Sequence, residues 1–62
     1  MKLLRRYKEP NAKWQETTIE ECIEHTEGNE YWKIGAVKKM LKKGLIVFTP
    51  FAEYKIKKGE LK

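Results

Sequence analysis

The chain has 62 residues, with 14 Lys and Arg against 9 Asp and Glu, which gives a formal net charge of +5. This length provides material for one small core, and a 40% hydrophobic content with few Gly and Pro excludes a disordered tail. The single cysteine excludes an intrachain disulfide, and no Cys and His cluster has metal-ligand spacing. We therefore expect one domain over residues 1–62, with no metal and no cofactor.

The N-terminal sequence MKLLRRYKEP has two leucines among charged residues and lacks the apolar stretch of a secretory signal. No run of the chain approaches the roughly 20 apolar residues of a membrane span. A lone thiol is typical of a reducing compartment. Together these features predict a cytoplasmic protein without a membrane partner.

Charge is distributed unevenly along the chain. Residues 1–13 carry five basic side chains and one glutamate, residues 14–30 carry six glutamates and no Lys or Arg, and residues 31–62 carry nine lysines and two glutamates. Such an asymmetry indicates either a surface for a partner or internal pairing between the acidic and basic blocks.

The segment before Pro10 is typical of a strand. Leu3 and Tyr7 lie on one side of an extended chain, and Pro10 marks a turn. We predict a short strand that ends near Lys8. Trp14 follows in a polar connector, where we expect it to lie over the core.

Residues 18–27 have a helical pattern. Thr18 precedes Glu21 by three residues, the capping-box arrangement in which each side chain satisfies a backbone amide of the first turn. Gly28 follows as a stop signal. One apolar stripe recurs at helical spacing at Ile19, Cys22, Ile23 and Thr26.

A second helix is predicted from near Ile34 to Gly44, which ends it. Its apolar stripe consists of Ile34, Val37, Met40 and Leu41. The opposite arc carries Lys38, Lys39, Lys42 and Lys43. The sequence LIVFTPFAEYKIKKG then predicts two strands joined at residues 49–51, the second of which alternates apolar and charged residues.

The order strand, helix, helix, strand, strand predicts an α+β domain. We expect two short helices to pack on one face of a small, mostly antiparallel, three-stranded sheet. The predicted core consists of Leu3, Tyr7, Ile19, Cys22, Ile23, Val37, Met40, Leu41, Ile46, Phe48, Tyr54 and Ile56.

This β-α-α-β-β layout resembles a minimal winged helix, in which the second helix enters the major groove and the hairpin touches the backbone beside it. The resemblance implies nucleic-acid contacts from Lys38, Lys39, Lys42 and Lys43 on the helix and from Lys55, Lys57 and Lys58 on the hairpin. The stretches YWKIGAVKKMLKKG and FTPFAEYKIKK also resemble small uncharacterised proteins from open reading frames of bacteriophages and mobile elements, over about the C-terminal half of the chain.

The lysine arc has two interpretations. Lysines on one arc can bind phosphates by releasing counterions, but the side of a helix opposite an apolar stripe is also ordinarily solvated. Arg, Asn and Gln are missing from the second helix, so a DNA contact there would be mainly to the backbone. The DNA interpretation requires the helix and hairpin lysines to converge on one accessible side of the molecule.

The acidic helix counts against DNA docking, since Glu20, Glu24 and Glu27 would be repelled by phosphates if this helix crossed the backbone. It can instead turn away, neutralise the lysine helix or face a basic protein. Exposed aromatic residues can stack on unpaired bases or anchor a protein interface.

Catalysis lacks a convincing residue set. The chain contains no serine, and Cys22 lies three residues before His25, which permits a Cys/His dyad by spacing alone. Cys22 falls on the apolar stripe, where a small buried thiol is the usual explanation. We therefore predict a non-catalytic binding protein, namely a DNA-binding accessory or regulatory factor. The alternative is a protein–protein interaction module that modulates a host or element-encoded protein, and a homodimer is left open.

Overall fold

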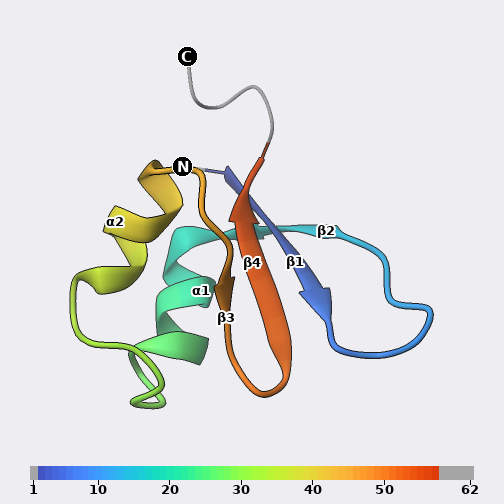
Figure 1. Ribbon diagram of the computed structural model, residues 1–62, viewed down its shortest axis with the longest axis horizontal. Helices are drawn as coiled ribbons and strands as arrows, with labels where there is room; N and C mark the ends of the chain where they lie inside the picture. Colours follow the sequence, from blue (N-terminus) through green and yellow to red (C-terminus); the bar gives the residue numbers. More distant parts are fainter. Residues whose placement is uncertain (1, 58–62) are drawn as a thin grey trace.

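The structure is a computed structural model that describes residues 2–57. Its elements are, in chain order, β1 (Lys2–Tyr7), β2 (Gln15–Thr18), α1 (Ile19–Thr26), α2 (Ala36–Lys42), β3 (Val47–Phe48) and β4 (Ala52–Ile56). The strands form one antiparallel sheet in the order β2-β1-β4-β3, and the two helices lie together to the left of β4 and β1 in Figure 1. The predicted α+β class is confirmed, but the sheet has four strands and not three.

Strand β2 is the element that the sequence did not predict. It pairs with β1 from Lys2 opposite Thr18 to Arg5 opposite Gln15. Only Thr17 is buried among its four residues, so the strand has almost no apolar signal. Its position depends on the backbone hydrogen bonds with β1, which a polar tetrapeptide can form as well as an apolar one.

Helix α1 begins as predicted, because the Thr18 hydroxyl accepts a hydrogen bond from the Glu21 backbone N–H at 3.2 Å. The reciprocal hydrogen bond of the predicted capping box, from the Thr18 backbone N–H to the Glu21 side chain, is replaced by other contacts of Glu21. The Glu21 carboxylate accepts a hydrogen bond from the Thr17 hydroxyl at 2.6 Å and pairs with the Arg5 guanidinium of β1. This side chain therefore ties α1 to the sheet.

Helix α2 starts later than predicted. Gly35 occupies the N-cap position with φ 83°, a left-handed conformation that favours glycine, and Ile34 is left outside the helix with 94% of its surface exposed. Gly35 has no side chain with which to cap the helix. The Glu27 carboxylate fills this role, accepting hydrogen bonds from the backbone N–H groups of Gly35 at 3.1 Å and Val37 at 3.3 Å.

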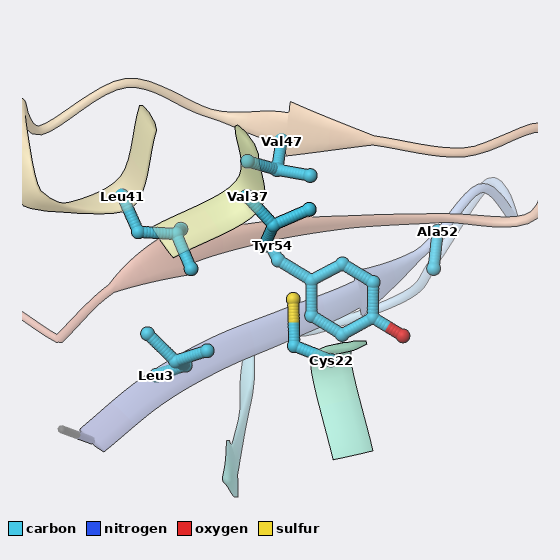
Figure 2. Packing of buried hydrophobic residues seen from close by; sticks show 7 residues of the cluster. All are labelled: Leu3, Cys22, Val37, Leu41, Val47, Ala52 and Tyr54. Atoms are coloured by element: carbon cyan, nitrogen blue, oxygen red, sulfur yellow. The ribbon is translucent and has the colours of Figure 1, made fainter. Parts of the chain in front are cut away.

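The core lies between the helices and one face of the sheet, as Figure 2 shows for its seven buried residues: Leu3, Cys22, Val37, Leu41, Val47, Ala52 and Tyr54. Five of these were predicted, namely all except Val47 and Ala52. Three further predicted residues pack at the edge of this cluster while partly exposed: Ile19, Met40 and Ile56.

The inward face of β3 was predicted wrongly. Ile46 and Phe48 are 47% and 58% exposed, and Val47 between them is fully buried opposite Tyr54. Side chains alternate along a strand, so a shift of one residue exchanges the two faces. The turn sets this phase, because the Thr49 hydroxyl accepts a hydrogen bond from the N–H of the residue that begins β4.

Candidate nucleic-acid interface

The four predicted lysines of α2 lie on its solvent side. Val37 and Leu41 are fully buried in the core, so the opposite arc of the helix is turned to solvent. None of the four forms an ion pair with a residue in the range 2–57. All are exposed, and we call them the lysine surface: Lys38, Lys39, Lys42 and Lys43.

The hairpin lysines lie on the other face of the sheet. Lys55 follows the buried Tyr54 and therefore points away from the helices, with its Nζ 4.3 Å from the centre of the Trp14 ring. Lys57 Nζ donates a hydrogen bond to Glu16 at 2.5 Å, and this hydrogen bond is the main reason that the pKa of the Glu16 carboxyl is lowered. Lys58 lies outside the described residues.

The sheet thus stands between the lysine surface and the hairpin lysines. The predicted interface needed both groups on one accessible side, and the described residues do not bring them together. Lys55 and Lys57 also already contact Trp14 and Glu16. A combined helix-and-hairpin surface is therefore not assembled, and the lysine surface has to be considered alone.

Several cations on the sheet face opposite the helices make internal contacts. Trp14, expected over the core, lies on this face with the Arg6 guanidinium 4.6 Å and the Lys55 ammonium 4.3 Å from its ring centre. Arg6 also donates to the Glu53 carboxylate at 2.8 Å. Arg6 and Lys57 pair with carboxylates on this face, and cations paired in this way are less available to phosphates, so this face is the weaker candidate.

Three of the six glutamates in the acidic block make side-chain contacts that hold the fold together. A hydrogen bond from Thr17 and then the charge of Arg5 lower the pKa of the Glu21 carboxyl, and the Arg5 side chain is only 13% exposed. Glu27 caps α2, and Glu16 pairs with the end of β4. The internal complementarity considered from the sequence is therefore present, although it leaves the lysine surface unpaired.

The end of β1, the α1–α2 connection and the β3–β4 turn lie toward the lower end of Figure 1. Aromatic side chains from these three segments line two neighbouring hollows. Tyr31 and Phe51 meet edge to face with ring centroids 6.2 Å apart, and Trp32 and Phe48 do so at 6.3 Å. Tyr7, predicted in the core, is 43% exposed here. We call these five residues the aromatic end. An excess of aromatic residues was the only sign of this cluster in the sequence.

The Cys22 and His25 side chains do not form a dyad. Burial raises the pKa of the Cys22 thiol to about 12, so the thiol is protonated at neutral pH. His25 Nδ1 instead lies 2.9 Å from the Tyr54 hydroxyl. Residues 2–57 contain no group of three His, Cys, Asp or Glu side chains placed to bind a metal ion, and neither of their helices has the length and apolarity to cross a membrane.

None of the family models, curated proteins or solved structures compared with the chain matches it. The lysine surface and the aromatic end are therefore the two features of residues 2–57 from which we infer a function.

Proposed function

We propose that the protein is a small, non-catalytic DNA-binding accessory or regulatory factor that contacts the phosphate backbone through the lysine surface of α2. One observation carries this proposal: three lysines of the seven-residue α2 and Lys43 at its C-cap share one exposed arc, and none of the four pairs with a carboxylate in residues 2–57. Unpaired cations at this density attract phosphates, because each contact releases a condensed counterion.

The sheet order gives partial support to a winged-helix-like arrangement. β1 pairs with β4 and β4 with β3, so the N-terminal strand joins the terminal hairpin beside two helices. The hairpin lysines point away from α2, however. Residues 2–57 thus lack the converging helix and hairpin surface that the DNA interpretation of the sequence required, and the proposal is narrowed to a contact by α2 without the hairpin as a wing.

The composition of α2 also defines the expected mode of binding. Its sequence AVKKMLK has no Arg, Asn or Gln, the side chains that commonly form paired hydrogen bonds with base edges. Lysines that contact phosphates position a protein on nucleic acid without reading its sequence. We therefore expect an affinity that depends strongly on salt and little on base sequence.

Binding of a fluorescently labelled duplex, followed by anisotropy over a series of salt concentrations, tests this proposal. A double variant, Lys38→Gln with Lys42→Gln, should weaken binding and reduce the slope of log Kd against log salt by about 2, since each lost phosphate contact removes about one unit. The matched control, Lys13→Gln with Lys55→Gln, removes the same charge elsewhere and should change the slope by less than about half as much.

Equal losses in the two double variants would show that only net charge matters and would overturn the assignment to α2. Failure of the parent protein to bind duplex or single-stranded DNA at low salt would remove the nucleic-acid proposal altogether. That result would favour the alternative function, a protein–protein interaction module.

A further inference from the structure

Two adjoining hollows lie at the aromatic end. The first has a volume of about 200 Å³ and is lined by aromatic and polar side chains that include Tyr7, His25, Asn29, Tyr31, Phe51 and Tyr54. The second is lined by Lys8, Tyr31, Trp32, Phe48 and Pro50 together with the buried Thr49. Tyr31 and Thr49 line both, so the two hollows are neighbours, and we call them together the recess.

Polar groups in the first hollow are only partly used by the protein. The Asn29 side-chain N–H donates to the Glu24 carbonyl oxygen at 3.0 Å, which leaves the Asn29 amide oxygen as an acceptor. His25 uses Nδ1 in its contact with the Tyr54 hydroxyl at 2.9 Å, which leaves Nε2 for another partner. An acceptor and a ring nitrogen beside aromatic rings suit the polar edge of a planar heterocycle.

The charge around the recess favours an anionic chain. Neither hollow is lined by an Asp or Glu from residues 2–57, whereas Lys8 borders the second with its Nζ 5.2 Å from the Phe48 ring centre. Phe48 and Phe51 are 58% and 66% exposed, so their rings are accessible for stacking. Exposed rings beside cations are the combination with which proteins bind single-stranded nucleic acids.

The contacts available in the first hollow determine which bases can bind there. In a duplex, the faces of each base are stacked on its neighbours and its Watson–Crick edge is paired, so a base that stacks on Phe51 and presents its polar edge to Asn29 and His25 has to be unpaired. The hollow would receive one base, and the ring of Phe51 at its rim would stack on it.

We propose that the aromatic end is a binding site for unpaired nucleobases, so that the protein prefers single-stranded to duplex nucleic acid. In this arrangement, bases stack on Tyr31 and Phe51 at the first hollow and on Phe48 at the second. Lys8 contacts a phosphate between them. This inference rests on the nucleic-acid-binding function proposed above and specifies the form of nucleic acid that the protein binds.

The test compares three labelled probes of equal length by anisotropy: an oligothymidylate, an abasic oligonucleotide with the same phosphates and no bases, and a duplex. Stacking of even one base should make the oligothymidylate bind at least about 5-fold more tightly than the abasic strand. Phe51→Ala should reduce this difference without changing the affinity for the abasic strand, because one of the stacking rings is lost. Phe51→Trp should restore it, and Ile34→Ala, an exposed apolar control, should leave it intact.

Two results would overturn the inference in distinguishable ways. Equal affinities for the oligothymidylate and the abasic strand, or a preference for the oligothymidylate that is as large in Phe51→Ala as in the parent, would refute base binding at this site and leave phosphate binding by α2 untouched. If the parent protein bound none of the three probes at about 50 mM salt, both proposals would fail, and the aromatic end would be left to a protein partner.

Discussion

Replacing Leu41 with alanine tests the packing that holds α2, and with it the lysine surface, against the sheet. Leu41 is fully buried in the cluster that joins both helices to the strands. A buried Leu→Ala change usually costs about 2–5 kcal/mol, from lost burial and from the cavity that remains. A domain of 62 residues has a total stability of about 3–9 kcal/mol, so the variant should lose a large share of it.

The assay is urea unfolding monitored by tryptophan fluorescence, repeated with Leu45→Ala as a matched control. Leu45 is 45% exposed, and its truncation should cost about 1 kcal/mol or less. In thermal melts, Leu41→Ala should lower Tm by about 10 °C or more. Equal losses in the two variants would mean that α2 does not pack through Leu41 and would refute the reasoning that places the lysines on its outer arc.

Three further predictions concern the helix cap, the strand register and the buried thiol. Glu27→Ala should destabilise the protein by about 1 kcal/mol and reduce the hydrogen-exchange protection of the first turn of α2, whereas Glu24→Ala on the exposed side of α1 should do neither. Val47→Asp should prevent folding as judged by circular dichroism, and Phe48→Asp should fold, which is the reverse of what the sequence-based register predicts. The Cys22 pKa is raised from 9.0 to about 12 in the folded state, so its contribution to stability is complete below pH 9 and is lost as the pH rises toward 12. Unfolding free energies measured between these pH values should therefore fall more steeply for the parent than for Cys22→Ala, and parallel curves would contradict the burial of the thiol.

The elements that the sequence predicted well are those with strong local signals. The Thr18 cap and the apolar spacing of α1 define a helix before any tertiary contact forms, and the predicted and observed ends agree within one residue. The β3–β4 hairpin was located correctly for the same reason, since Pro50 separates two segments rich in β-branched and aromatic residues. Both depend on interactions among neighbours in the chain.

The features that the sequence could not predict depend on contacts between distant segments. Strand β2 is defined by backbone pairing with β1, and the late start of α2 by the Glu27 carboxylate. Arg5 lies on the same face of β1 as Leu3, two residues away. Its partner Glu21 is distant in the sequence, so the ion pair could not be predicted before the fold was known. Contacts between distant segments produce no periodic pattern of apolar residues, so sequence analysis does not detect them.

The candidate site was predicted only in part, for a related reason. Helical spacing correctly placed the four lysines of α2 on one exposed arc. Spacing carries no information on which face of a sheet a helix covers. The position of Lys55 and Lys57 on the opposite face, and the gathering of the aromatic end from three separate segments, could be recognised only in the folded molecule.

The position of bound nucleic acid is tested most directly by NMR, because the chain has two tryptophans at contrasting sites. Trp32 belongs to the aromatic end and its indole N–H donates to the Phe48 carbonyl oxygen at 2.8 Å, whereas Trp14 lies on the sheet face opposite the helices. On titration with an oligothymidylate, we predict shifts of the Trp32 indole resonance and of the α2 backbone amides, with the Trp14 indole resonance unchanged. A shift of the Trp14 indole resonance, with the Trp32 indole and α2 amide resonances unchanged, would place the nucleic acid on the sheet face opposite the helices. That result would contradict both proposed binding surfaces.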